Sequence, residues 1–462
     1  MTNSSFRSHM GGCSWGALIF LLAANGLHAQ QADGRKAAPT ATDQTVVGLR
    51  VFDDADPVTV SNGVRFVKGD GGKLRFKRPP RAARTQLFRG FEPGDITFEA
   101  VGPGAEASVY PEWWGAAGND APSCAKANVA AINAALTAVS NTHLAVSLEG
   151  TYCIDGQLFP RSGSTLKGPG AVKAVPGLSL PPHSYLIEVR GQSEVVIDGI
   201  EVDGNRLSQA QDAAHTYGGI YVTESTRCTV RKCVVHHCNG PLNGGGCGNG
   251  IRTRAASDVL IADNTIHSNN GCGINIYYAS KRVQAVHNTI FNNTEIGIES
   301  EGRNGRNYAA FRNEDIFLFD NEISGHTEPD RREDHAVLVD WTDEATVLSN
   351  RCRLSRSNGI EILGCRQVVI AGNTCKEFGG KRPADPWAAV RITAERYGED
   401  GRSQHVAIFG NDLSLSLNAV YLDTVDGAVI GENRVAGIEN KEPLKVGPGV
   451  NGLQTLPEAP ER

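Results

Sequence analysis

The sequence predicts an all-β protein, a parallel β-solenoid, from a recurring phrase, its period and its composition. Between about residues 228 and 435, an apolar run, an Asn, an Ile or Val two positions later, a polar turn and Gly-Ile-x-Ile return in varied form. A unit of about 22 to 24 residues holds only short strands, so the units must stack to bury an apolar core. The recurring residues are Asn264, Asn288, Asn321, Asn350, Asn373, Asn411 and Asn433.

Composition separates this repeat from a leucine-rich repeat of similar period. Leucine-rich units need several Leu each, whereas these units use Ile, Val and Gly, and the chain contains 53 Gly. An Asn at one fixed turn position suits a left-handed backbone conformation, and its amide can bond the Asn of the next coil. We therefore expect the Asn residues to form a structural ladder.

The chain of 462 residues is long enough for one large domain with appendages. Residues 1–29 look like a secretory signal, because Arg7 and His9 precede a short apolar run and Ala29 offers a cleavage point. This predicts a secreted or periplasmic protein without an integral membrane segment. The expected divisions are a signal at 1–29, a linker at 30–44, a small β module at 45–108, the solenoid at 109–437 and a disordered Pro-rich tail at 438–462.

Charge and cysteine content restrict which ligands, disulfides and metal sites the sequence can be expected to have. The formal net charge is −6 and no basic stripe with interleaved aromatics occurs, which argues against nucleic acid. Export would permit disulfides among the 11 cysteines, and Cys124 with Cys153 is the expected pair. Cys352 and Cys375 share the inward position of the repeat, where stacked thiols and a bridge are equally compatible with the sequence. No Cys-x-x-Cys spacing predicts a metal site.

Several motifs before and within the repeats point to a known group of proteins. They are Pro-Glu-Trp-Trp-Gly-Ala at 111–116, an Ala-rich helix at 130–136, Gly-Thr-Tyr at 150–152, Ser-Thr-Leu-Lys-Gly at 164–168 and Val-Asp-Gly-Asn at 202–205. With them, residues 85–435 resemble the pectate-lyase-like superfamily of right-handed parallel β-helices. The resemblance implies that fold, an N-terminal helix closing the open end, a polysaccharide or oligosaccharide partner, and a monomer or homotrimer. It implies no single reaction, because similar proteins include lyases, hydrolases, epimerases, transglycosylases and phage-tail depolymerases.

Reaction signatures of these relatives are absent. The Gly-His-Gly of polygalacturonase-type hydrolases does not occur, and Glu333-Asp334-His335 only faintly resembles the Asp-Pro-His-Asp of alginate epimerases. Candidate site residues therefore have to be inferred from which side chains share a face of the predicted solenoid.

The alternation of each Gly-Ile-x-Ile strand predicts which side chains share a face. The Ile residues point inward, so x and the residue two positions later point outward, about 4.8 Å from their neighbours on adjacent coils and about 6.6 Å from each other. One sheet face then carries candidate acids and bases, namely Glu299, Glu301, Asp340 and Glu361, and candidate substrate contacts, namely Arg252, Arg254, Asn275, Tyr277 and Arg391.

Insertions next to these strands predict a groove over the same face. They lie at 241–248, 326–333 and 379–387 before the strand, and at 302–312 and 394–403 after it. Insertions in solenoids often gather on the binding face. Trp341, Trp387 and Tyr308 could stack on sugar rings there, or pack as ordinary core residues.

The predicted face suits more than one chemistry. A carboxyl pair at the expected separations favours hydrolysis or transfer of a glycosidic bond without a cofactor. Tyr277 beside Arg252 would instead suit a lyase or C5-epimerase acting on a uronate polymer, with Ca²⁺ or Arg neutralising the uronate and His236, His237 or His335 as further bases. A third possibility is a non-catalytic surface that binds a polysaccharide. The negative charge of the chain slightly favours hydrolysis or transfer.

Overall fold

The computed structural model describes most of the chain from residue 108 to residue 456, and four short strands before it. The described residues are 44–47, 65–68, 73–78, 88, 96–98, 108–210, 212, 215–240, 248–303, 311–325, 335–355, 357–378, 387–394, 401–439 and 443–456. The predicted signal and most of the predicted linker lie outside them. None of the helices in these ranges is long and apolar enough to cross a bilayer.

Three parallel sheets wind together from residue 108 onward. Sheet D, which carries the candidate site, has ten strands. They are β10 (Ser184–Arg190), β13 (Tyr217–Thr223), β16 (Ile251–Arg254), β19 (Ile274–Tyr277), β22 (Ile298–Glu301), β25 (Val337–Asp340), β28 (Ile360–Leu363), β31 (Ala388–Thr393), β34 (Asn418–Leu422) and β37 (Leu444–Val446).

Sheets B and C form the other two faces of the solenoid. Sheet B contains β5 (Ser108–Val109), β6 (Ala145–Ser147), β8 (Thr165–Lys167), β11 (Val196–Asp198), β14 (Thr229–Arg231), β17 (Ser257–Ala262), β20 (Lys281–Val286), β23 (Asn313–Phe319), β26 (Thr342–Leu348), β29 (Arg366–Ala371), β32 (Ser403–Phe409), β35 (Val425–Gly431), β38 (Val450–Asn451) and β39 (Gln454–Thr455). Sheet C contains β7 (Thr151–Ile154), β9 (Ala171–Ala174), β12 (Glu201–Asp203), β15 (Val234–His236), β18 (Thr265–His267), β21 (Thr289–Phe291), β24 (Glu322–Ser324), β27 (Arg351–Ser355), β30 (Thr374–Phe378), β33 (Asp412–Ser416) and β36 (Arg434–Ala436).

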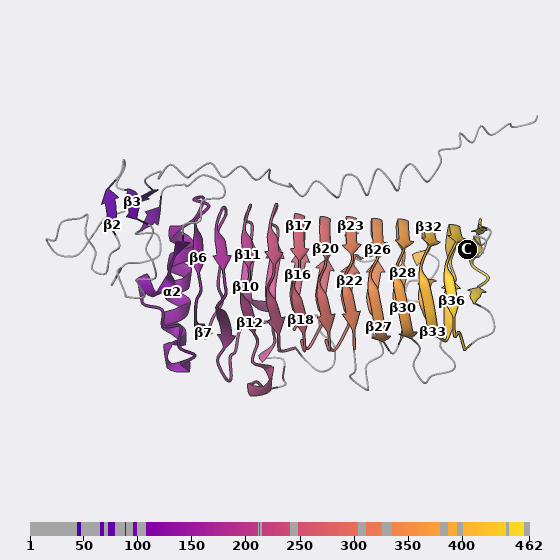
Figure 1. Ribbon diagram of the computed structural model, residues 1–462, viewed down its shortest axis with the longest axis horizontal. Coiled ribbons are helices and arrows are strands. Elements are labelled where there is room, and N and C mark those ends of the chain that lie inside the picture. The colour runs from indigo at the N-terminus through magenta and orange to yellow at the C-terminus, as the bar shows by residue number, and fades with distance from the viewer. Residues whose placement is uncertain are drawn as a thin grey trace, which may run out of the picture. The chain divides into compact units, whose positions relative to one another are not determined.

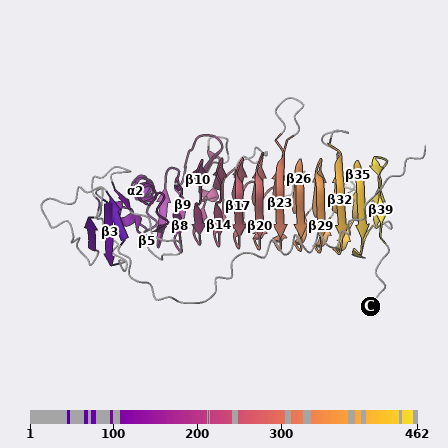
Figure 2. The ribbon, with the colours of Figure 1, turned by 90° about the horizontal axis from the view of Figure 1, so that it is seen from above.

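Each coil passes through sheet D, then sheet B, then sheet C, and the next coil pairs with it in register. The strands therefore stand side by side in ranks (Figures 1 and 2). This confirms the predicted fold class, a right-handed parallel β-helix, and confirms at the level of fold the resemblance that the motifs gave.

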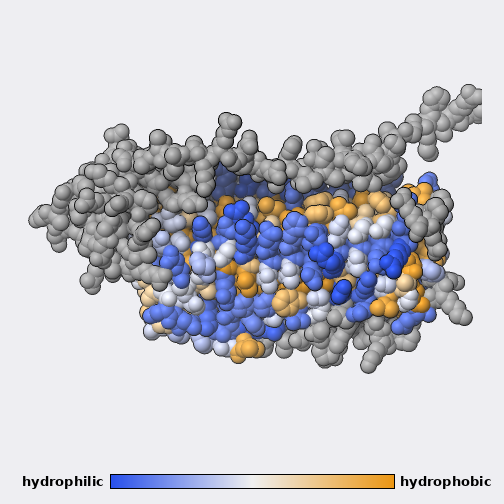
Figure 3. Space-filling model, viewed as in Figure 1, coloured by the Kyte–Doolittle hydropathy of each residue, from blue (hydrophilic) through white to orange (hydrophobic). Residues whose placement is uncertain are grey.

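Stacked inward side chains form one continuous core. In sheet C, for example, Ile266, Ile290, Ile323, Cys352 and Cys375 follow one another in register, and all are fully buried. Polar residues occupy most of the outward positions, so the described surface in Figure 3 is mainly hydrophilic, with scattered apolar residues.

The predicted Asn ladder is present, but its backbone conformation differs from the prediction. The side-chain amide of each of the six Asn residues from Asn264 to Asn411 donates to the side-chain oxygen of the next, at 2.8 to 3.0 Å. The left-handed conformation belongs to the residue before each Asn, as at Asp263, His287 and Asp320. The prediction that Asn itself is left-handed is wrong, because none of these seven Asn residues has a positive φ and the left-handed residue comes one position earlier.

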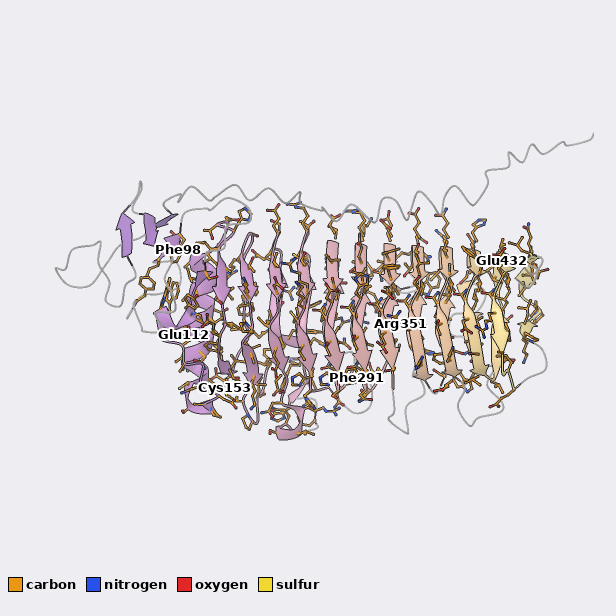
Figure 4. All side chains as sticks on the ribbon, in the orientation of Figure 1. Phe98, Glu112, Cys153, Phe291, Arg351 and Glu432 are labelled. Atoms are coloured by element: carbon orange, nitrogen blue, oxygen red, sulfur yellow. The ribbon has the colours of Figure 1, made fainter. Side chains whose placement is uncertain are left out.

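The N-terminal motifs close the open end of the solenoid. Helix α2 (Ala125–Ala138) buries Ile132 and Leu136 against the first coil. It follows the 3₁₀ helices η2 (Pro111–Trp114) and η3 (Pro122–Cys124). In η2, Trp113 is fully buried, and the neighbouring Glu112, labelled in Figure 4, accepts a hydrogen bond of 2.6 Å from the Tyr152 hydroxyl. The two sequence motifs thus meet in space and cap the core.

Before the cap, sheet A has four strands, β1 (Gln44–Val47), β2 (Arg65–Lys68), β3 (Lys73–Arg78) and β4 (Thr97–Phe98), in the order β1-β4-β3-β2. At the opposite end, the predicted disorder of 438–462 is wrong for residues 444–455. There β37 pairs with β34 of sheet D, and β38 and β39 pair with β35 of sheet B. The edge strand of a parallel sheet has unpaired backbone N–H and C=O groups, with which the following segment of the chain can pair.

The expected disulfide is also wrong. Cys124 and Cys153 are both free, and the Cys153 thiol donates to Asp120 Oδ1 at 3.3 Å. Cys352 and Cys375 are free, stacked core thiols, one of the two arrangements that the sequence allowed.

Candidate functional site

The outer face of sheet D carries the predicted rows in the predicted register. Strand pairing places the first row as Tyr221, Arg252, Asn275, Glu299, Leu338, Glu361, Arg391 and Tyr421. It places the second row as Thr223, Arg254, Tyr277, Glu301, Asp340, Leu363 and Thr393. All four candidate acids therefore share one face.

Sequence reasoning missed the start of these rows. Glu188 and Arg190 of β10 precede Tyr221 and Thr223 in register. They line a pocket of about 290 Å³ together with Phe159, Pro160, Arg161 and Gln192. Here Arg190 Nη2 lies 2.6 Å from Glu188 Oε1, and the Gln157 side-chain amide donates to Glu188 Oε2 at 2.9 Å. The repeat phrase is weak before residue 228, so nothing in the sequence marked this coil.

Glu299 lies in a pocket of hydrogen-bond donors. Its Oε2 accepts from the Asn275 amide and from the Cys272 thiol, whose sulfur is 3.2 Å away. Burial raises the pKa of Glu299, and the charge of Glu295 adds to this, while the two donors and Arg252 oppose it. Donors directed at the carboxylate favour its ionised form.

Glu301 lies two residues further along β22, on the same face, and one of its donors is different. The Tyr278 hydroxyl donates to its Oε1 at 3.3 Å. Burial, and after it the charge of Glu299, raise the pKa of Glu301 to about 8, while Arg252, Asn275 and Tyr278 oppose the shift. The two carboxyl groups are coupled, so the pair keeps a proton to a higher pH than an isolated carboxyl group does.

An aromatic and cationic stack borders this pair. The Arg252 guanidinium lies 3.7 Å from the centroid of the Tyr277 ring, which stacks on Tyr278 with centroids 3.5 Å apart. Arg252 is buried, whereas Arg254 in the second row is exposed. The stack fixes one side of the Glu299–Glu301 pair.

A small apolar cluster divides the predicted face into two parts. Leu338 and Leu363 pack with Cys272 and Ile296 on the outside of sheet D, apart from the main core. Both Leu residues were predicted to face outward, but the sequence did not show that they would be buried. The nine candidate residues therefore do not form one patch.

Beyond the divider, Glu361 is held by three polar side chains. His335 Nε2 lies 3.0 Å from Glu361 Oε2, the Asn358 amide donates to the same oxygen at 3.1 Å, and Arg391 Nη1 lies 3.4 Å from Oε1. The Ser357 hydroxyl in turn lies 3.1 Å from His335 Nδ1. All these groups are buried, so the cluster resembles a structural ion-pair network more than an open acid–base pair.

The other predicted features are Asp340, the aromatic residues and the groove walls. Asp340 pairs in register with Glu301, but it is only 2% exposed. Trp341 is buried, and the Arg312 guanidinium lies 5.2 Å from its ring. Trp387 is half-buried, and its carbonyl accepts from Asn418. Tyr308 and most of the predicted groove walls lie outside the described residues.

Glu361 does not suit a Ca²⁺ ion, which requires six to eight oxygen ligands. Both oxygens of Glu361 already contact His335, Asn358 and Arg391. Within the described parts of the chain, three potential ligand atoms come within 4.8 Å of one another only at Asp203, His236 and His237, on sheet C.

Comparison with known proteins agrees with this architecture. Residues 181–316 match the family model described as "Right handed beta helix region". The A-module of mannuronan C-5 epimerase AlgE4 from Azotobacter vinelandii is 18% identical, with a TM-score of 0.56 over 74% of this chain and 98% of that one. The AlgE6 A-module from the same organism is also 18% identical, with a TM-score of 0.54 over 76% and 100%.

A family 28 exopolygalacturonase from Yersinia enterocolitica is 12% identical, with a TM-score of 0.54 over 77% of this chain and 79% of that one. Comparison with curated proteins gives no significant match. At these identities the likeness concerns the fold, and the site has to be interpreted from its own side chains.

Proposed function

We propose that the protein is an exported enzyme that hydrolyses glycosidic bonds of a polysaccharide, with Glu301 as general acid and Glu299 as general base. The observation that carries this proposal is the pair of carboxyl groups on one face of β22 in unlike surroundings. A protonated and an ionised carboxyl side by side provide the acid and the base of this reaction. The likeness of residues 1–29 to a secretory signal supports export.

The separation along the strand sets the expected stereochemistry. Residues two apart on a strand are about 6.6 Å apart at their Cα atoms, close to the lower limit of about 6.5 to 9.5 Å between the carboxyl groups of inverting enzymes. Glu301 would protonate the leaving oxygen, and Glu299 would take a proton from the attacking water. A Glu301–Asp340 pair, about 4.8 Å apart across neighbouring strands, would instead suit retention. We favour Glu299 because it is partly exposed, whereas Asp340 is 2% exposed.

A lyase or C5-epimerase is the second candidate. The Arg252 guanidinium stacked on Tyr277 offers a positive charge and a phenol at one site, the groups needed to neutralise a uronate carboxylate and abstract its C5 proton. Structural likeness to two mannuronan C-5 epimerase modules supports keeping this candidate.

The test is a panel of neutral and uronate polysaccharides incubated with the full chain. New reducing ends whose anomeric configuration is inverted, as measured by NMR, would support the proposal. Retained configuration would instead indicate that Asp340, and not Glu299, acts together with Glu301. Ultraviolet absorbance from unsaturated ends, or a change in uronate epimer composition without cleavage, would support the second candidate. Glu301→Gln should abolish hydrolysis, and Glu314→Gln, an exposed ion-pair partner of Lys281 on sheet B, should not. Binding without turnover would refute both enzyme proposals.

A further inference from the structure

A second cluster of chemically reactive side chains lies on sheet C, away from the candidate acids. Asp203 ends β12, His236 ends β15, and His237 follows His236 directly. Each offers one ligand atom, and the three atoms lie within 4.8 Å of one another. His236 Nδ1 is 2.6 Å from His237 Nδ1 and 3.7 Å from Asp203 Oδ1.

The fold places these three groups together. Parallel pairing of β12 and β15 sets Asp203 directly beside His236. His237 has a φ of 53°, and its ring meets that of His236 edge to face with centroids 4.8 Å apart. The Asn205 backbone N–H donates to Asp203 Oδ1 at 2.7 Å, which fixes the carboxylate. A Cβ at Gly204 would lie 2.3 Å from the His237 carbonyl oxygen, so only glycine allows this approach of the two turns.

Neighbouring groups orient the imidazole of His236. Glu201 Oε1 lies 3.1 Å from His236 Nε2 and accepts its proton, which leaves Nδ1 facing His237 and Asp203. A carboxylate on the far nitrogen is the usual partner of a metal-binding histidine. The His267 ring stacks on His236 at 5.1 Å and 4°, and Phe291, labelled in Figure 4, stacks on His267 at 4.7 Å and 9°. This stack restrains the ring plane.

We propose that Asp203, His236 and His237 bind a divalent transition metal of the zinc type. Two imidazole nitrogens and one carboxylate oxygen are a donor set that Zn²⁺ accepts with tetrahedral geometry, leaving one position open. Imidazole donors disfavour Ca²⁺ and Mg²⁺, which prefer oxygen. The ligand side chains are partly exposed, 12% for His236 and 19% for Asp203, so an ion can enter from solvent.

The metal would join two successive coils at the turns that lead towards sheet D. The chain after Asp203 continues to β13, and the chain after His237 continues to β16, the strands that carry Tyr221 and Arg252. The site is therefore independent of the acid pair in chemistry, but it would stabilise the edge of the face on which that pair lies.

The test uses untagged full-length protein stripped with a chelator. Zn²⁺ titrated by calorimetry should bind with one equivalent and raise the melting temperature, and Co²⁺ should give the visible d–d absorption of a tetrahedral site. His237→Asn should weaken Zn²⁺ binding at least about 100-fold, and Glu201→Gln about 10-fold to 100-fold. His405→Asn is the matched control, since His405 is exposed and has a φ of 55°, and it should bind as the unaltered protein does.

Three results would overturn the proposal: no Zn²⁺ binding, one equivalent bound equally by His237→Asn, or Co²⁺ without a tetrahedral spectrum. The close His236–His237 contact would then be a hydrogen bond alone. If His237→Asn does not fold, Asp203→Asn gives the same comparison, and Zn²⁺-dependent melting of the unaltered protein remains measurable.

Discussion

Glu301 and Glu361 lie on the same outer face of sheet D, two strands apart, yet their carboxyl groups have opposite surroundings. Glu361 is buried and contacts His335, Asn358 and Arg391 within 3.4 Å. Glu301 has the Tyr278 hydroxyl at 3.3 Å and the charge of Glu299 beside it, and its pKa is raised to about 8 by burial first and by that charge second. A place on the outer face of sheet D therefore does not decide the role of an acid, which depends on the groups that contact its carboxylate.

The largest expected effect separates the two residues in catalysis. Glu301→Gln should lower kcat by about 10² to 10⁴, since the proposed general acid is lost while the shape of the side chain is kept. Glu361→Gln should lower kcat of the folded enzyme by less than about tenfold. Steady-state kinetics on the substrate found in the panel checks both. Equal losses would mean that the two acids act together and would end the distinction.

The same pair of residues should differ in the opposite direction in stability. Glu361→Ala removes the carboxylate that buried Arg391 contacts at 3.4 Å, and breaking a buried ion pair typically costs about 3 to 5 kcal/mol. Denaturant unfolding measures the loss, with Glu301→Ala as the matched variant. A Glu361→Ala protein as stable as Glu301→Ala would show that the buried network does not stabilise the fold.

Stability should fall with pH because of Glu301. Its pKa is raised from 4.5 to about 8 in the folded protein, so above about pH 4.5 the unfolded chain releases a proton that the folded chain still holds. This destabilisation grows up to about pH 8 and is constant above it. Glu301→Gln removes it and should gain about 2 kcal/mol at pH 8, less than the full linkage value because water reaches the side chain.

Thermal unfolding of both proteins from pH 5 to pH 9 measures this difference. A gap between the two proteins that stays constant over this range would contradict the raised pKa of Glu301.

The smallest effect concerns the donor to Glu301. Tyr278→Phe removes a hydroxyl that opposes the raised pKa of Glu301, so the alkaline limb of the activity profile should move upward. The rate at pH 8 should change by no more than about tenfold, as expected for one hydrogen bond. Tyr421→Phe, further along the same face, is the control and should leave the profile in place. A downward shift in Tyr278→Phe would mean that the hydroxyl does not donate to the carboxylate.

The parts of the site that could be predicted are those that strand alternation fixes. Glu299 and Glu361 share a row because a strand turns each successive side chain to the other face, and the repeat sets the register. The residues that distinguish them were not predictable as neighbours. Cys272 and Asn358 lie in turns before their strands, and Tyr278 lies just after one, where the two-residue alternation no longer fixes side-chain direction.

The sequence by itself determined the solenoid, its period, the Asn ladder and the two outward rows, because a repeated local pattern can bury its apolar side in only one way. Tertiary structure decided which acid is neutralised, which thiols stay free and where the tail pairs. These outcomes depend on contacts between different coils, as between Glu361 and Arg391 or between Asp203 and His236. The strength of these contacts depends on distance and burial, which the order of the residues alone does not specify.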